Sequence, residues 1–190
     1  MLSDFKCPLC GISLTVCSGS DNCNFKCSSL DCHFTSSLKE AIDISYKNGT
    51  GAAKGLSNLA PYKFIFDKIE CTSFESFIQS LRVKDPDMQK EVCSFPALFC
   101  YSIRLDLNDW RKDKTVYWKG NQINRLSMQY SELMSSAYDA LFEQSPTFRH
   151  LLQSTTGKLL LHSTGCVINT ETLLTPKEYL DNLERLRKLL

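Results

Sequence analysis

The sequence predicts an α+β fold, in which a helix-rich domain with a small sheet follows a small cysteine-rich ribbon. Three observations indicate this arrangement. Apolar residues recur at the three- and four-residue steps of helices in several long segments. Short alternating segments between them are typical of strands. Many of the ten cysteines gather near the N-terminus. We therefore expect the ribbon at residues 1–36 and the main domain at residues 37–190.

Composition excludes several classes of protein. The chain has 190 residues, 43% of them hydrophobic, which suffices for one full domain and a small appendage. A formal charge of +1 argues against a broad nucleic-acid surface. No apolar run approaches the length of a membrane span, and residues 1–7 lack the basic and apolar regions of a signal peptide. We expect a soluble, cytoplasmic protein with no membrane partner.

The cysteines of the first segment have the spacing of a metal site. A first knuckle, FKCPLCG, places Cys7 and Cys10 close together, and KCSSLDC supplies Cys27 and Cys32 as a second pair. Zinc prefers four soft ligands in a tetrahedron, and a segment this short has too little core to fold without one. The ribbon is therefore predicted to hold a structural Zn²⁺ on these four cysteines.

The sequence is also compatible with other ligand sets. Cys17 and Cys23 compete with the second pair, and His33 could replace one ligand. The preferred set leaves two knuckles separated by a turn-rich loop, CSGSDN, which suits a ribbon hairpin. Buried or free thiols without a metal are the alternative.

The main domain is predicted to combine short strands with longer helices. Alternating residues on either side of Asp67-Lys68 are typical of a hairpin with a tight turn. Asp85-Pro86 and Thr175-Pro176 each join an N-cap residue to a proline at the first helical position. In order, we expect a strand at 42–45, a flexible Gly-rich loop at 47–55, a hairpin at 62–71, helices from 72 and from 85, an apolar core stretch at 95–103, an extended segment with a turn at 110–122, helices at 127–144 and 146–153, a strand at 158–163 and a last helix from 175.

The helix that follows Thr72 carries a line of polar groups. Glu75, Gln79 and Arg82 follow one another at spacings of four and three, which places a carboxylate, an amide and a guanidinium on one face. Such a face could hold a polar ligand. In the alternative, Thr72 and Glu75 form a capping box while Gln79 and Arg82 face solvent. An apolar stripe beside this face is expected to be buried: Phe74, Phe77, Ile78 and Leu81.

Two blocks of the chain resemble one known family. The first, SNLAPYKFIFDKIECTSFESFIQSLRVKDPDMQKEV, is similar to the core signature of the NADAR (YbiA-like) family, with a Ser-Asn-Leu turn, a short strand and a helix carrying Glu and Gln. The second, TVYWKGNQINRLSMQYSELMSSAYDALFEQSPTFRHLLQSTTGKLLLHSTG, resembles the later block of that family. Ordered agreement over residues 41–190 is more specific than any lone motif. The resemblance implies a YbiA-like domain with a zinc-ribbon extension.

The resemblance also implies a chemistry. NADAR proteins act on ADP-ribose and related N-glycosides: some cleave riboflavin-pathway intermediates, and others remove ADP-ribose from guanine in DNA. By resemblance, this chain is expected to be an N-glycosidase for a ribosyl bond in an ADP-ribose-type substrate, such as ADP-ribosylated guanine in nucleic acid or a related nucleotide. Breaking that bond builds positive charge on the sugar, which a carboxylate can stabilise while it activates water. Glu75 is the candidate for this catalytic role.

The matching motifs suggest the remaining site residues. Asn58, in the Ser-Asn turn, suits a ribose hydroxyl or a base edge, and Gln79 is expected to bind substrate as well. Trp118 could stack on a base, although a tryptophan in this context is more often core. His162 could protonate the leaving base, although a lone histidine is more often structural. Arg82 could hold a phosphate, but it stands where the family usually has lysine, which puts any mechanism with an amine nucleophile in doubt.

Two further classes of function stay open. One is a non-catalytic module that binds NAD or ADP-ribose, which the departure at Arg82 favours. The other is a zinc-dependent nucleic-acid adaptor in which the large domain is a scaffold, and the near-neutral charge argues against it. In the leading hypothesis the zinc ribbon recruits nucleic acid or protein. Because the cysteines are remote in sequence from Glu75, the metal is expected to be structural.

Overall fold

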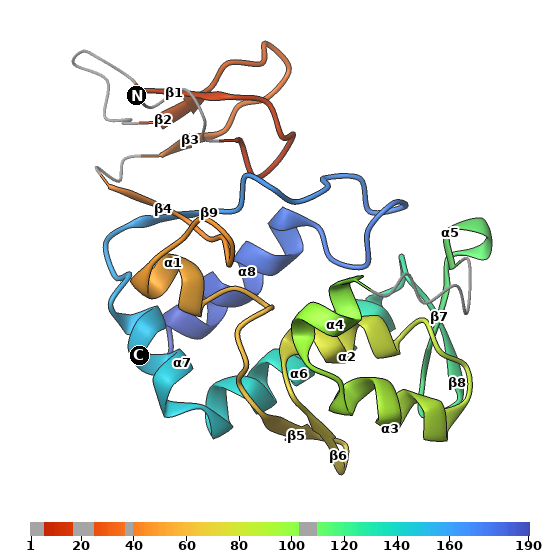
Figure 1. Ribbon diagram of the computed structural model, residues 1–190. Helices are drawn as coiled ribbons and strands as arrows, with labels where there is room; N and C mark the ends of the chain where they lie inside the picture. Colours follow the sequence, from red (N-terminus) through yellow and green to blue (C-terminus); the bar gives the residue numbers. More distant parts are fainter. Residues whose placement is uncertain (1–5, 17–24, 37–39, 103–109) are drawn as a thin grey trace. The chain divides into compact units, whose positions relative to one another are not determined.

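The computed structural model of the chain describes residues 6–16, 25–36, 40–102 and 110–190 (Figure 1). They form two compact units. Unit 1 comprises Met1–Ser57, His150–Ile168 and Leu174–Leu190, and unit 2 comprises Asn58–Arg149 and Asn169–Leu173. Helices and small sheets are mixed within the chain, which confirms the predicted α+β class. The predicted domain boundary after residue 36 is not tested by this division and stays a prediction.

The N-terminal segment of unit 1 forms a small antiparallel sheet. Its strands are β1 (Leu14–Val16), β2 (Phe25–Cys27) and β3 (Thr35–Ser36), in the order β1-β2-β3. Leu14 lies opposite Cys27 in the register, and both side chains are buried. Thr15 and Lys26 form the next pair and are exposed, because successive side chains of a strand point to opposite faces. The sheet therefore has one inner and one outer face.

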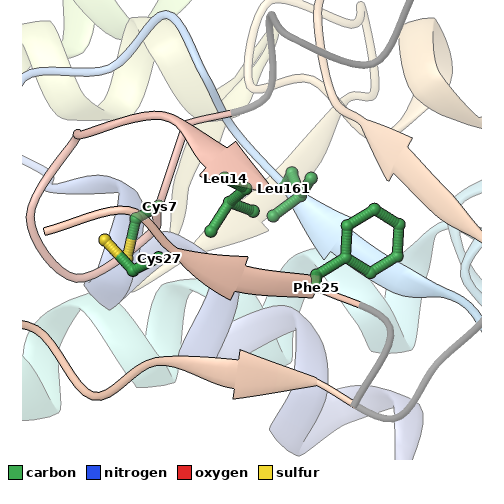
Figure 2. Packing of buried hydrophobic residues seen from close by; sticks show 5 residues of the cluster. All are labelled: Cys7, Leu14, Phe25, Cys27 and Leu161. Atoms are coloured by element: carbon green, nitrogen blue, oxygen red, sulfur yellow. The ribbon is translucent and has the colours of Figure 1, made fainter. Parts of the chain in front are cut away.

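A second sheet of unit 1 continues this core. It pairs β4 (Ala41–Asp43) in parallel with β9 (Leu159–Leu161). Figure 2 shows Leu161 of β9 packed among the inward side chains of the ribbon. The cluster of buried residues comprises Cys7, Leu14, Phe25, Cys27 and Leu161. The ribbon and the β4–β9 sheet thus share apolar contacts, so the burial of one depends on the other.

Helices α1 (Gly51–Gly55) and α8 (Pro176–Arg187) belong to unit 1, whereas α7 (Pro146–Gln153) begins in unit 2 and continues into unit 1 at His150. The start of α8 is as predicted, with the hydroxyl of Thr175 accepting a bond from the amide of Glu178 at 3.2 Å in a capping box. The prediction of a flexible loop over residues 47–55 is wrong, because its second half is α1. Ala52 and Ala53 are strong helix formers, and their preference outweighs that of the flanking glycines.

Unit 2 contains the remaining elements. The hairpin is confirmed, and Asp67 and Lys68 of its turn have φ values of 49° and 69°, in the left-handed region that tight hairpin turns require. The strands and helices of unit 2 are β5 (Phe64–Phe66), β6 (Ile69–Cys71), α2 (Phe74–Ser80), α3 (Pro86–Ser94), α4 (Ala97–Ser102), α5 (Trp110–Asp113), β7 (Thr115–Trp118), β8 (Asn121–Asn124) and α6 (Met128–Gln144). The hairpin is formed by β5 and β6.

Two segments of unit 2 differ from the sequence prediction. The stretch at 95–103 is not wholly core: α4 buries Ala97 and Cys100, whereas Leu98 and Phe99 are 55% and 46% exposed. The segment at 110–122 begins with the short helix α5, which was not predicted, and the β7–β8 hairpin that follows contains the predicted extended residues and turn. In the stretch at 95–103 an apolar composition was visible, but only tertiary packing decides which of its side chains become buried.

Helices α2 and α6 build the core of unit 2 with aromatic side chains. The ring of Phe74 stacks on that of Tyr138 with a centroid distance of 3.7 Å, and Phe77 meets Trp118 edge to face at 5.1 Å. At the end of α6, Gln144 bonds both the amide and the carbonyl of Ile65 at 2.8 Å, so its side chain extends the edge of β5 as a strand would. These contacts fix α2 against its neighbours. Within the described residues, no helix is long and apolar enough to cross a membrane.

Candidate functional site

The start of α2 determines what Glu75 can do. The N-cap is Ser73, whose hydroxyl accepts a bond from the amide of Ser76 at 3.0 Å. In return, the hydroxyl of Ser76 accepts the amide of Ser73 at 3.1 Å. The alternative capping box of Thr72 and Glu75 is therefore wrong by one residue. Thr72 instead donates to the carbonyl of Phe95, and the carboxylate of Glu75 is available for other partners.

Glu75, Gln79 and Arg82 form a chain of hydrogen bonds along α2 and its C-terminal end. The amide nitrogen of Gln79 donates to Oε1 of Glu75 at 2.8 Å, and Arg82 donates from Nη1 to Oε1 of Gln79 at 3.3 Å. All three side chains are half-buried. The three polar groups that the spacing placed on one face thus contact one another, with Gln79 linking the carboxylate to the guanidinium.

Asn58 lies next to this chain. Its backbone carbonyl accepts the amide of Glu75 at 2.9 Å, which satisfies one of the free amides in the first turn of the helix. Its side-chain oxygen accepts the hydroxyl of Tyr138 at 2.8 Å. The backbone hydrogen bond therefore places Asn58 and Glu75 next to each other.

The environment of Glu75 disfavours its charge. Burial raises the pKa of this carboxyl, and the hydrogen bond from Gln79 lowers it by a smaller amount. The net effect is a raised pKa. A carboxyl with a raised pKa can exchange protons closer to neutral pH, which suits general acid and base chemistry.

Trp118 occupies the core of unit 2. Its side chain is only 4% exposed, and its ring packs against Phe66 at 5.5 Å and against Phe77. Its indole N–H donates to the carboxylate of Asp67 at 2.7 Å. These contacts describe a structural tryptophan, and the stacking of a base on it stays a prediction.

His162 belongs to unit 1, whereas the other predicted catalytic and binding residues belong to unit 2. Its Nδ1 lies 2.8 Å from the carbonyl of Ile44, and its ring meets Tyr179 edge to face. A carbonyl only accepts, so Nδ1 must carry the hydrogen, and Nε2 is the basic atom of the neutral ring. The geometry thus defines which nitrogen could exchange a proton.

A second candidate site is the cysteine cluster of the ribbon. The sulfur atoms of Cys7, Cys10, Cys27 and Cys32 all lie within 4.8 Å of one another. Sγ of Cys7 is 3.6 Å from that of Cys32, and Sγ of Cys10 is 3.4 Å from that of Cys27. Bonds of about 2.3 Å place the sulfur ligands of a tetrahedral zinc about 3.8 Å apart. These four cysteines therefore fit a metal site.

Backbone amides near the two cysteine pairs are placed to stabilise the negative charge of thiolate ligands. The amides of Leu9 and Ser29 each point to a cysteine sulfur, of Cys7 and Cys27 respectively, at 3.4 Å. Burial raises the pKa of the Cys7 thiol to about 12, so a bound cation is what would keep this sulfur as a thiolate.

The competing ligands are placed as follows. His33 is exposed and is not part of the four-sulfur cluster found among the described residues. Cys17 and Cys23 lie outside the part of the chain that the structure describes.

Comparison with known proteins identifies the family. Residues 51–188 match the family described as bacteriophage protein GP30.3. The chain belongs to this family. It is also 31% identical over 133 residues to an uncharacterized 17.1 kDa protein in the Gp30-rIII intergenic region of Enterobacteria phage T4, a match that covers 70% of this chain and 88% of that protein.

A solved structure supports the fold. The NMR structure of the Escherichia coli protein YbiA matches with a TM-score of 0.52 and 16% sequence identity, over 80% of this chain and 85% of that chain. The predicted YbiA-like fold is thereby confirmed. The GP30.3 match begins at residue 51, after the ribbon. The assignment of a metal-binding ribbon is therefore supported by the cysteine cluster and not by the family match.

Sequence reasoning missed two features of the site. One is the Ser73–Ser76 capping box, although the spacing of the two serines was visible. The other is Tyr138 of α6, which is buried and donates to Asn58. Tyr138 stands four residues after Met134 and eight after Tyr130, both buried, so the helical period alone could have found it.

Metal binding is expected to stabilise the β4–β9 sheet as well as the ribbon, because Leu161 packs in the ribbon core. Addition of metal to the metal-free chain should slow amide hydrogen exchange at residues 41–44 and 159–161, measured by mass spectrometry. The β7–β8 hairpin of unit 2 serves as the internal control. Unchanged exchange in β4 and β9 after metal has bound would contradict the shared core.

The raised pKa of Glu75 predicts a pH-dependent loss of stability. Between the unfolded value of about 4.3 and the higher folded value, the folded state holds more protons, so the stability of the wild type falls as pH rises through this window. Glu75→Gln cannot titrate. The variant should therefore be more stable than the wild type at pH 7, with the gap closing below about pH 4. Denaturant unfolding at a series of pH values measures this, with Glu91→Gln as the exposed control.

Proposed function

We propose that this protein is an N-glycosidase that hydrolyses a ribosyl N-glycosidic bond in an ADP-ribose-type substrate, such as ADP-ribosylated guanine in nucleic acid or a related nucleotide. The observation that carries the proposal is the hydrogen-bonded chain of Glu75, Gln79 and Arg82 beside Asn58. The YbiA-like fold supports it, because the sequence motifs resemble a family that acts on such bonds. The same chemistry on riboflavin-pathway intermediates is the nearest alternative substrate class.

Glu75 would act at the sugar. As the bond from C1′ to the base nitrogen breaks, its electron pair leaves with the base and positive charge develops on the ribose. Gln79 already occupies Oε1 of Glu75, so Oε2 would face the substrate. The carboxylate would stabilise the charge and accept a proton from water, whose oxygen then bonds to C1′. The raised pKa of Glu75 makes it a stronger base than an exposed glutamate.

The leaving base needs a proton, and His162 is proposed to supply it. Because Nδ1 is engaged by the carbonyl of Ile44, the proton would come from Nε2 of the imidazolium. The products are then a ribose hydroxyl and a neutral base, and the cycle closes when Glu75 releases its proton to solvent and His162 takes one up from solvent.

The remaining residues would bind. Arg82 presents a planar fork suited to a phosphate oxygen. Gln79 holds this guanidinium on one side and Glu75 on the other, so binding of a phosphate would also order the carboxylate. Asn58 would contact a ribose hydroxyl or a base edge. Direct attack by water requires no amine nucleophile, so the guanidinium of Arg82 is compatible with this mechanism.

A module that binds NAD or ADP-ribose without turnover is the second candidate. It is favoured by the same chain of hydrogen bonds, in which each polar group is already engaged by its neighbour. Calorimetry that gives tight ADP-ribose binding, together with no hydrolysis across a panel of N-ribosides, would select this candidate over the enzyme.

For the ribbon we propose a structural Zn²⁺ held by Cys7, Cys10, Cys27 and Cys32. Four thiolates are the donor set that zinc takes in structural sites. The outer face of the sheet carries Thr15 and Lys26, which are exposed and suited to a phosphate backbone. Recruitment of nucleic acid is therefore the proposed role of the ribbon, and hydrolysis of modified nucleic acid would then depend on salt more steeply than hydrolysis of a nucleotide.

Glu75→Gln is expected to keep the fold and to lower the release of ADP-ribose by at least about 100-fold, because a catalytic carboxylate contributes about that much. Chromatography of products from ADP-ribosylated guanine, in nucleic acid and as a nucleotide, measures the rate. Glu91→Gln, on the exposed side of α3, is the matched control. Equal rates for wild type and Glu75→Gln would remove Glu75 from the mechanism.

The purified chain is expected to contain about one zinc ion, as in structural sites with four cysteine ligands. Cys7→Ser or Cys32→Ser should lose it, whereas Cys166→Ser should retain it because Cys166 is exposed and stands outside the cluster. Elemental analysis of the purified variants provides the measurement. Retention of full zinc in Cys7→Ser would refute the ligand set.

A further inference from the structure

Arg82 stands beyond the end of α2, so the helix itself does not fix its position. The last residue of α2 is Ser80, and Leu81 is the C-cap. The final carbonyls of a helix have no partner within it, and other groups must donate to them. The amide of Tyr117 in β7 donates to the carbonyl of Leu81 at 2.8 Å. The turn that carries Arg82 is therefore held by contacts from elsewhere in unit 2.

Gln89 of α3 supplies most of these contacts, and its side chain is fully buried. Its Nε2 donates to the carbonyls of Val83 at 2.7 Å and Tyr117 at 2.8 Å, with a longer contact of 3.4 Å to the carbonyl of Ser80. Its Oε1 accepts the amide of Lys119 at 2.7 Å. One buried amide thus joins the end of α2 to the β7–β8 hairpin.

The orientation of the Gln89 amide is fixed by its partners. A backbone carbonyl can only accept a hydrogen bond, and a backbone N–H can only donate one. Rotation of the amide by 180° would place Oε1 against carbonyls and Nε2 against the N–H of Lys119, which costs free energy in a buried site. The carbonyls of Ser80 and Val83, on either side of Arg82 in the chain, are consequently held in place relative to the hairpin.

We propose that Gln89 is a positioning residue that holds Arg82 where its guanidinium can bind a phosphate of the ligand. Gln89 is buried and acts through the backbone of residues 80–83. Without its bonds, this turn would be less ordered, and the guanidinium would have to be ordered when the ligand binds. This inference rests on the proposed function and extends it, because it names the β7–β8 hairpin as the support of the phosphate contact.

The test compares four forms of the full chain: wild type, Gln89→Met, Arg82→Ala and the double variant. Methionine keeps the length and helix preference of glutamine but has no N–H to donate. Calorimetry with ADP-ribose is expected to give about fivefold weaker binding for Gln89→Met, the cost of ordering one long side chain. Arg82→Ala and the double variant should bind equally, because Gln89 acts on the ligand only through Arg82.

Gln144→Met is the matched control. Gln144 also bonds one backbone amide and one backbone carbonyl, both of Ile65, but at the edge of β5. Only Gln89→Met should weaken binding at a temperature where every variant is folded. Should Gln89→Met not fold, Gln89→Glu takes its place, because it keeps an oxygen for the amide of Lys119. Wild-type affinity in the Gln89 variant, an equal loss in Gln144→Met, or a double variant weaker than Arg82→Ala would overturn the proposal.

Measurements without ligand separate this inference from the proposed function. In nitrogen-15 NMR of the wild type, the side-chain amide protons of Gln89 should exchange with solvent far more slowly than those of the exposed Gln153. The Nε–H signal of Arg82 should broaden or shift in the Gln89 variant. If the wild type neither binds nor cleaves ADP-ribose but both signals behave in this way, the proposed function fails and the positioning role stands. Fast exchange at Gln89, or an unchanged Arg82 signal, refutes the positioning role whatever the activity.

Discussion

The candidate site depends on how the first turn of α2 satisfies its backbone amides. The amides at a helix start have no partner within the helix, so other groups must accept them. Here Ser73 accepts the amide of Ser76, and the carbonyl of Asn58 accepts that of Glu75. Both bonds come from groups other than the Glu75 side chain. The carboxylate is consequently released from capping, and the asparagine is fixed beside it by the bond that completes the helix.

The ribbon is connected to β9 by side-chain packing as well as by the covalent chain. Its inner face carries Leu14 and Phe25, and β9 contributes Leu161 to the same cluster. A sheet of three short strands has little core of its own. The apolar surface of β9 adds to it, and four thiolates on one bound cation would add the rest. Because His162 directly follows β9, a metal bound by the ribbon would support the segment that carries the proposed acid.

The sequence predicted those features that local chemistry decides. Thr175-Pro176 and Asp85-Pro86 begin helices, and Asp67-Lys68 turns a hairpin, because each requirement is met within a few residues. The errors arose where distant contacts decide. Thr72 and Ser73 can both serve as N-cap residues, and the carbonyl of Phe95, far along the chain, engages Thr72. Likewise, the bond from Tyr138 to Asn58 spans eighty residues, so no local pattern could reveal it.

The hydrogen bonds from Arg82 to Gln79 and from Gln79 to Glu75 all run in one direction, from donor to acceptor, along α2. A guanidinium can only donate, so the bond from Arg82 must be accepted by Oε1 of Gln79. That leaves the amide nitrogen of Gln79 to donate to Glu75, and the amide cannot turn over without losing both bonds. Arg82 thereby fixes the polarity of Gln79, which in turn fixes one oxygen of Glu75. Replacement of Arg82 by lysine would keep the positive charge but not the planar fork, because a flexible ammonium can reach several acceptors. The guanidinium at this position therefore orients the carboxylate as well as supplying charge.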